Sequence, residues 1–175
     1  MKTISFGTIT TSHLGIIGVA MSEQGLVNTD LRLASTEEFA QAIALRQNAE
    51  LVPGGERVAD ALRQIEEYLA GDREEFEIPI DWSGMTEFKM AVLRATLGIP
   101  YGETLSYGEV AAQIGRPRAA RAVGQAEAKN PIPLVIPCHR VIGANGEMRG
   151  YGGPEGVNLK AWILAFEAGE TFPEG

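Results

Sequence analysis

Apolar residues in the first half of the chain follow the spacing of strands and then that of helices. Residues 14–21 form a short, glycine-broken apolar run that predicts a strand, with residues 3–10 and 25–33 as its neighbours. Residues 35–49 begin with a serine N-cap and acidic residues, which predicts a helix start. Apolar residues then recur at helical spacing over 58–69. The pattern predicts a small antiparallel sheet with two helices.

Two segments interrupt this pattern. Val52-Pro53-Gly54-Gly55 is predicted to break the chain between the two helices. Residues 73–82 have the composition of a connector with a short extended piece. We therefore place a domain boundary at the end of this segment, which predicts an N-terminal domain of residues 1–80 and a C-terminal domain of residues 81–175.

The C-terminal half predicts two short helices joined by a tight turn. A first helix with one apolar face is expected from Thr86 and is stopped by glycine and proline near residue 100. Ser106 and Glu109 have the spacing of a capping box, which opens the next helix. Gly115-Arg116-Pro117 turns the chain into a second helix over 118–129. The pair has the form of a helix-turn-helix, although many such hairpins bind no nucleic acid.

The last third combines a buried run, a turn and a closing helix. Residues 134–136 are apolar and predict a buried, strand-like segment. Asn145-Gly146 is a strong hairpin-turn signal, and residues 150–154 form a glycine-rich loop suited to covering a ligand or to plain connection. A final helix is expected from Asn158. Together these elements predict an α/β (α+β) protein with a mostly helical C-terminal domain.

Composition and charge narrow the function classes. The chain has 175 residues, of which 45% are hydrophobic and 22% charged, values typical of a globular protein with a core. No apolar run is long enough for a transmembrane helix, and no signal peptide is evident. With a single cysteine, this favours a reducing cytoplasmic compartment, or the nucleus if the source is eukaryotic.

The net charge of −8 argues against a nucleic-acid partner for the chain as a whole. The charge is unevenly distributed, because residues 1–80 carry 6 basic and 13 acidic side chains. Residues 89–149 carry 8 basic and 4 acidic ones. This local excess is compatible with DNA docking and equally with chance asymmetry on a solvated surface.

Cys138 is the one cysteine, so it can form no internal disulfide and supplies no two-cysteine metal clip. It is either a buried spectator or a nucleophile. His139 follows it directly and Arg140 adds a positive charge, a setting that favours a lowered thiol pKa. His13, the other histidine, has no comparable neighbourhood and is expected to be structural.

The stretch Ile136-Pro137-Cys138-His139-Arg140-Val141 resembles the active-site signature of the O6-alkylguanine-DNA alkyltransferase family. The likeness extends over residues 83–170. Residues 100–107 resemble the family's entry to its helix-turn-helix, residues 118–124 its recognition helix, and Trp162 to Glu167 its closing helix. The resemblance implies a ribonuclease H-like N-terminal domain, a monomer without a cofactor, and DNA carrying O6-alkylguanine, and possibly O4-methylthymine, as substrate.

The resemblance also implies the catalytic roles. Cys138 would accept the alkyl group irreversibly, so one molecule repairs one lesion. In an extended segment Cys138 and His139 point to opposite faces, so a water is expected to bridge them. Glu167 would orient His139, Asn130 would support the active-site hydrogen bonds, and Tyr107 would protonate the departing base.

The same resemblance places the helix-turn-helix in the minor groove with the target nucleotide flipped out. Arg121 would fill the gap in the base stack. The other residues expected to contact DNA are Arg116, Arg118, Ala119, Ala122, Gly124, Lys129 and Arg140. The residues expected to line the base pocket are Tyr107, Pro133, Val135, Tyr151, Gly152, Gly153 and Lys160.

Several positions depart from the family pattern. Gly152 stands where some members have a serine near the base, which predicts the loss of one hydrogen bond. Glu127 and Ala128 stand where some members have apolar or basic residues, which predicts weaker DNA binding. The front half shows no cysteine- and histidine-rich cluster, so no structural zinc is expected. Two other functions remain open: a cysteine hydrolase using Cys138, His139 and Glu167, and a DNA-binding lesion sensor in which the thiol is inert.

Overall fold

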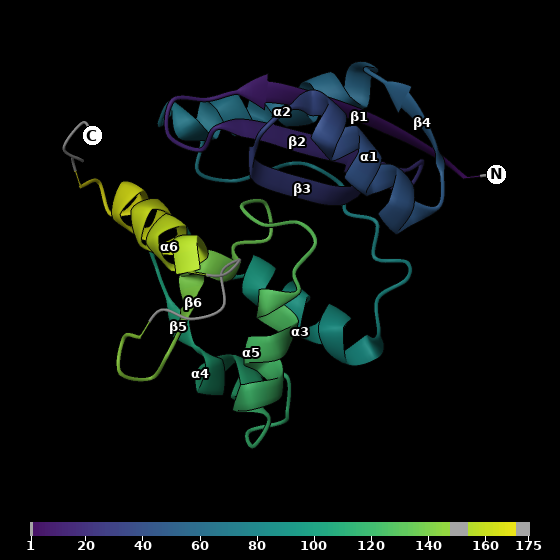
Figure 1. Cartoon of the computed structure of the whole chain (residues 1–175). Helices are drawn as coiled ribbons and strands as arrows, with labels where there is room; N and C mark the ends of the chain where they lie inside the picture. Colours follow the sequence, from purple (N-terminus) through teal and green to yellow (C-terminus); the bar gives the residue numbers. More distant parts are fainter. Residues whose placement is uncertain (1, 148–153, 171–175) are drawn as a thin grey trace. The chain divides into compact units, whose positions relative to one another are not determined.

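The computed structural model describes residues 2–147 and 154–170, with the side chains of its last helix from residue 159 onward. It divides the chain into two compact units (Figure 1). The first comprises residues 1–83 together with 131–133, and the second comprises residues 84–130 and 134–175. The division therefore falls slightly later than the sequence boundary at residue 80, and the first unit includes a short piece of the C-terminal half.

The first unit is built on a four-stranded sheet in the order β3-β2-β1-β4. The elements are β1 (Thr3–Thr10), β2 (Ile16–Met21), β3 (Leu26–Leu33), α1 (Thr36–Gln47), β4 (Glu50–Pro53) and α2 (Glu56–Leu69). Strands β1 to β3 form the predicted antiparallel meander. β4 pairs with β1 in parallel, so the segment predicted only to break the pattern contributes an edge strand first. The break follows at Gly54 and Gly55, both of which have positive φ.

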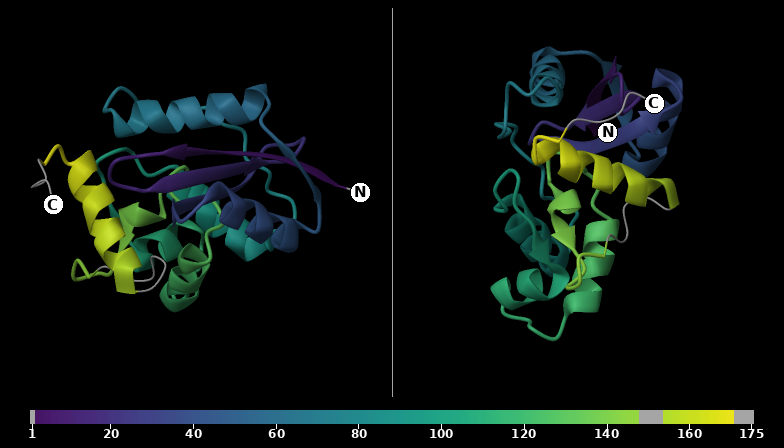
Figure 2. Two further views of the ribbon diagram at one scale, coloured as in Figure 1. Left: turned by 45° about the horizontal axis from the view of Figure 1, so that its top comes forward. Right: turned by 90° about the vertical axis from the view of Figure 1, so that its left-hand side faces the viewer.

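Helices α1 and α2 cover opposite faces of this sheet (Figure 2). Gly7 on β1 lies against Val58 and Leu62 of α2, while Gly18 on β2 lies against the ring of Phe39 in α1. A Cβ atom at Gly18 would come within 2.6 Å of that ring, so the absence of a side chain permits the close packing. The result is a three-layer unit that buries apolar side chains on both sides of one sheet.

Residues 131–133 join the first unit through hydrogen bonds to β3. The backbone N–H of Thr29 donates to the carbonyl of Pro131 at 3.0 Å, and its hydroxyl donates to the carbonyl of Pro133 at 2.7 Å. Proline has no backbone N–H, but its carbonyl remains an acceptor. Pro133, expected in the base pocket, thus has its carbonyl held by Thr29.

The second unit contains α3 (Glu87–Leu97), β5 (Leu105–Ser106), α4 (Tyr107–Gln113), α5 (Ala120–Ala128), the 3-10 helix η1 (Cys138–Arg140), β6 (Val141–Ile142) and α6 (Pro154–Glu167). Helices α4 and α5 form the predicted helix-turn-helix, and the capping box of Ser106 and Glu109 is present. The core of the second unit includes Val92, Val110 and Val123, each with 0% exposure. α5 and α6 begin at Ala120 and Pro154 rather than at the predicted residues 118 and 158.

Among the helices that the structure describes, none combines the length and the apolar character that crossing a bilayer requires.

Candidate active site around Cys138

The backbone turns sharply just before Cys138. Pro137 has φ −81° and ψ 64°, and the N–H of Cys138 donates to the carbonyl of Ile136 at 2.8 Å. These values describe an inverse γ-turn, which the proline ring favours by restricting φ. Leu134, three residues before Pro137, has φ 76°, a strained conformation for a non-glycine residue.

This geometry corrects two sequence expectations. Residues 134–136 are buried but form a turn, and no strand is assigned there. Cys138 then opens the 3-10 helix η1, so the alternation argument that placed Cys138 and His139 on opposite faces of an extended segment does not apply. The chain reverses here because Pro137 and the positive φ of Leu134 interrupt any regular strand.

The thiol of Cys138 lies in the interior, with 4% of the residue exposed. Burial raises its pKa to about 12, the opposite of the lowering expected from its charged neighbours. A hydrogen bond from the Asn130 side chain and the positive charge of Lys160 act to lower the pKa without offsetting burial. The resting thiol is therefore protonated, and attack requires a base that removes its proton.

His139, the residue after Cys138, is fully buried, with 0% exposure. Its Nε2 lies 2.9 Å from Oε2 of Glu167. Burial lowers the pKa of His139, so the ring is neutral at rest, and a neutral ring that bonds a carboxylate through Nε2 carries its hydrogen there. Nδ1 is then an acceptor, and within residues 2–147 and 154–170 it has no hydrogen-bond partner.

Arg140 holds the carboxylate that orients His139. Its Nε and Nη2 donate to the two oxygens of Glu167 at 2.8 Å each, and its Nη1 donates to the carbonyl of Ile99 at 2.7 Å. The guanidinium also lies over the ring of Tyr101. Arg140 is 7% exposed and its guanidinium is taken up by these partners, so its burial does not support the expected contact with DNA.

Tyr107 and Lys160 form a second polar group of the same unit. Lys160 Nζ donates to the hydroxyl of Tyr107 at 3.3 Å and to the carbonyl of Val141. Burial lowers the pKa of Lys160. The ammonium donates to the Tyr107 oxygen, so the tyrosine is the acceptor in this contact.

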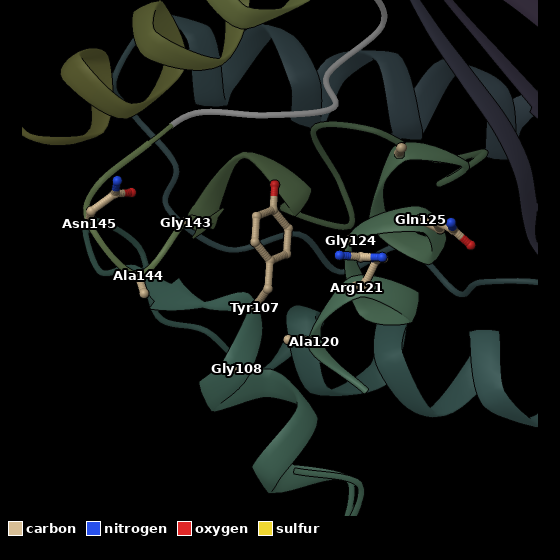
Figure 3. A pocket seen from close by; sticks show the side chains of 10 residues that line it. Tyr107, Gly108, Ala120, Arg121, Gly124, Gln125, Gly143, Ala144 and Asn145 are labelled. Carbon is tan, nitrogen blue, oxygen red and sulfur yellow. The ribbon is translucent and has the colours of Figure 1, made fainter. Parts of the chain in front are cut away.

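Tyr107 also projects into a pocket of about 830 Å³ (Figure 3). α5 contributes Ala120, Arg121 and Gly124 to the wall, and the turn at 143–145 lies on the other side of the tyrosine. Gly124 leaves room beside the Tyr107 ring, because a Cβ atom there would lie 3.8 Å from it. Cys138 is not among the described residues that line this pocket.

The basic residues of the helix-turn-helix lie on its surface. Arg118, Arg121 and Lys129 are exposed, as is Ala122, while Ala119 and Gly124 are partly exposed. Arg116 is exposed and its guanidinium lies over the ring of Phe88. Glu127, expected near the phosphates, is instead 5% exposed and is directed into the interior. The surface of α5 is therefore more positive than its sequence indicates.

Of the remaining residues expected to line the base pocket, the structure describes Val135. Val135 is buried, 3% exposed, in the turn that precedes Cys138. Tyr151, Gly152 and Gly153 lie outside the described residues. Within the described ranges, no three His, Cys, Asp or Glu side chains are grouped so that they could hold a metal ion.

The sequence did not indicate Thr96 as a site residue, and it did not indicate the partners of Arg140. Thr96 on α3 is hydrogen-bonded to Glu127 on α5, and the two residues are 31 positions apart in the sequence. Arg140 was expected beside Cys138 and in contact with DNA, but its bonds to Glu167 and Ile99 were not predicted. The partners of Arg140 come from segments 27 and 41 residues away, so no local pattern could indicate the pairing.

Comparison with known proteins covers both units. Residues 87–169 match the model for "6-O-methylguanine DNA methyltransferase, DNA binding domain", and residues 6–82 match that for its ribonuclease-like domain. The constitutive methylated-DNA–protein-cysteine methyltransferase of Bacillus subtilis is 35% identical over 164 residues, 94% of this chain and 96% of that protein. The Mycobacterium leprae methyltransferase is 52% identical over 116 residues, 66% of this chain and 68% of its own.

Solved structures agree with the sequence matches. The O6-methylguanine methyltransferase of Mycobacterium tuberculosis superposes with a TM-score of 0.79 at 40% identity, covering 98% of this chain and 96% of that one. A complex of Mycobacterium tuberculosis OGT with DNA gives a TM-score of 0.77 at 41% identity, with 95% and 93% covered. On these matches, and on a buried Cys138–His139–Glu167 group beside a helix-turn-helix, the chain belongs to the 6-O-methylguanine DNA methyltransferase family.

Proposed function

We propose that this chain repairs DNA by moving an alkyl group from guanine O6 to the thiol of Cys138. The observation that carries the proposal is the buried group around the thiol: His139 with Nδ1 as an acceptor, Glu167 bonded to its other nitrogen, and Arg140 holding Glu167. This is the arrangement that a protonated thiol needs before it can attack.

The reaction begins with removal of the thiol proton. His139 Nδ1 accepts it, directly or through one water, and the resulting imidazolium is stabilised by the Glu167 carboxylate. Arg140 keeps that carboxylate ionised and fixed in place. The thiolate sulfur then attacks the alkyl carbon, so a carbon–sulfur bond forms as the bond to guanine O6 breaks.

The departing guanine carries the electrons of the broken bond as negative charge. Tyr107 supplies its hydroxyl proton to the base, and the neighbouring Lys160 ammonium stabilises the phenolate that remains. The product on Cys138 is a thioether, which water does not cleave. One molecule therefore removes one alkyl group, and the chain needs no second cysteine to resolve an intermediate.

Binding is assigned to the exposed basic face of the helix-turn-helix. Arg118 and Lys129 are exposed and would contact phosphates, with Ala119, Ala122 and Gly124 allowing close approach in the minor groove. The base is flipped toward the pocket at Tyr107, with Arg121 in its place in the stack. Asn130 and Val135 support the thiol side of the site. The protein would act on DNA in the cytoplasm, or in the nucleus if the source is eukaryotic.

Intact-mass and peptide mass spectrometry after mixing with a duplex containing O6-methylguanine tests this proposal. We expect one methyl group on the Cys138 peptide and no further turnover with excess DNA. The same duplex with unmodified guanine is the control. Cys138→Ala is expected to bind the duplex and to transfer nothing. Repeated turnover would indicate a hydrolase, and binding without a mass change would indicate a lesion sensor; either result would overturn the proposal.

A further inference from the structure

Glu127 is a buried acid that the proposed reaction does not use. It lies on the inner face of α5, next to the core residue Ala126, and is 5% exposed. Its Oε1 is hydrogen-bonded to the hydroxyl of Thr96 on α3. Its Oε2 is buried and has no hydrogen-bond partner among the residues that the structure describes. Burying an ionised carboxylate whose second oxygen has no hydrogen bond costs free energy, so the neutral acid is favoured.

The hydrogen bonds of Thr96 allow either protonation state of Glu127. The Thr96 hydroxyl oxygen lies 2.8 Å from the carbonyl of Val92, one turn earlier in α3, in addition to its contact with Glu127. A threonine hydroxyl has one hydrogen and can donate it to only one of these acceptors. When that hydrogen bonds Val92, the contact with Glu127 is a hydrogen bond only if the carboxyl carries a proton.

Two titratable groups from other elements act on this carboxyl. Lys160 on α6 attracts its negative charge, and Cys138 on η1 is affected by it in turn. Burial raises the pKa of Glu127 to about 7, against the lowering effects of Thr96 and Lys160. At Cys138 the two charges oppose each other, since ionised Glu127 raises the thiol pKa and Lys160 lowers it. The charge near the thiol therefore depends on one proton.

We propose that Glu127 is a positioning residue whose proton controls the reactivity of Cys138, with the neutral acid as the faster form. The inference rests on the proposed alkyl transfer and extends it to regulation by pH. With Glu127 neutral, the Lys160 ammonium is the charge that acts on the forming thiolate. With Glu127 ionised, its negative charge opposes the thiolate and partly compensates Lys160.

The pH dependence of single-turnover transfer distinguishes this role from a structural one. Glu127→Gln keeps a group that can hydrogen-bond Thr96 but cannot ionise. We expect variant and wild type to transfer at equal rates near pH 6, and the variant to be roughly fivefold faster near pH 8.5, with the ratio changing around neutral pH. Glu103→Gln, on the exposed surface of the same unit, removes one charge and serves as the matched control.

A second measurement does not depend on transfer. The side-chain carboxyl resonance of Glu127 is followed by carbon-13 NMR across the same pH range in wild type and in Thr96→Val. The wild-type resonance is expected to titrate near neutral pH, and the variant at higher pH because the hydrogen bond that favours the charged form is lost.

Identical pH profiles for wild type and Glu127→Gln, or titration of Glu127 at the pH of an ordinary carboxyl, would overturn the inference. Absence of transfer by wild type at every pH would instead overturn the proposed function, and the NMR titration would still decide the state of Glu127. If Glu127→Gln does not fold, a shift of the rate profile in Thr96→Val tests the same coupling, and an unshifted profile would contradict it.

Discussion

Arg140 and Glu167 form a bidentate ion pair inside the second unit, in which both carboxylate oxygens accept from the guanidinium at 2.8 Å. The Glu167 side chain is fully buried, so it depends on Arg140 and His139 for the charge and hydrogen bonds that water would otherwise supply. The pair thereby connects stability to the proposed chemistry, because the same carboxylate is bonded to His139, the proposed base.

Arg140→Met is expected to destabilise the protein by about 3–5 kcal/mol, because it leaves the Glu167 carboxylate buried and unpaired. Urea denaturation at neutral pH measures this loss. Arg118→Met, at an exposed position, is the matched control and should change stability by less than about 0.5 kcal/mol. Equal stability of the two variants would show that the pair contributes nothing.

Glu167→Gln should slow transfer by about 10²-fold while leaving DNA binding unchanged. The Glu167 carboxylate raises the pKa of His139 against the effect of burial, so its removal makes the ring a weaker base. Quenched-flow transfer and a separate binding titration distinguish the two effects. Transfer at the wild-type rate would mean that His139 needs no ionised partner.

Tyr107→Phe should also slow transfer by about 10²-fold, because the departing guanine loses its proton donor. The ring remains, so the pocket between α5 and the 143–145 turn keeps its shape. Comparison of methyl transfer from O6-methylguanine with binding of the same duplex provides the measurement. A loss of binding with unchanged transfer would assign the hydroxyl to recognition instead.

Arg121→Ala should reduce transfer from duplex DNA more than it reduces DNA binding, because Arg121 is assigned to the gap left by the flipped base. A fluorescent base analogue opposite the lesion reports flipping. Arg118→Ala is the matched control. It should weaken binding to all sequences and reduce the slope of log binding constant against log salt concentration by about one, the value of one phosphate contact. Unchanged flipping and repair in Arg121→Ala would refute the intercalation role.

Stability should depend on pH through Glu127. Its pKa is about 7 in the folded chain against 4.5 when unperturbed, so the folded state binds the proton more tightly. The stabilisation is complete below pH 4.5 and is lost as pH rises through 7, a difference of about 3 kcal/mol. Chemical denaturation of wild type and Glu127→Gln between pH 5 and pH 8 measures it, and parallel curves would contradict it.

Local sequence was sufficient wherever the determining interactions are short-range. The meander of the first unit, the N-cap at Ser35 and the capping box at Ser106 were all predicted, because they depend on periodicity and on residues three positions apart. The helix-turn-helix followed for the same reason. The signature at residues 136–141 was also recognised from the sequence, because its residues are consecutive.

Tertiary structure decided which charged groups are buried and what they face. Nothing local distinguishes Arg140 and Glu127 from surface residues, yet packing of α3, α5 and α6 places both in the interior. For that reason the pKa of Cys138 is raised, whereas the sequence predicted that it would be lowered. Burial of the thiol outweighs the effect of its charged neighbours. The sequence by itself determined the nucleophile and its family, whereas the three-dimensional burial of charge decided how that nucleophile is held inactive and which groups can activate it.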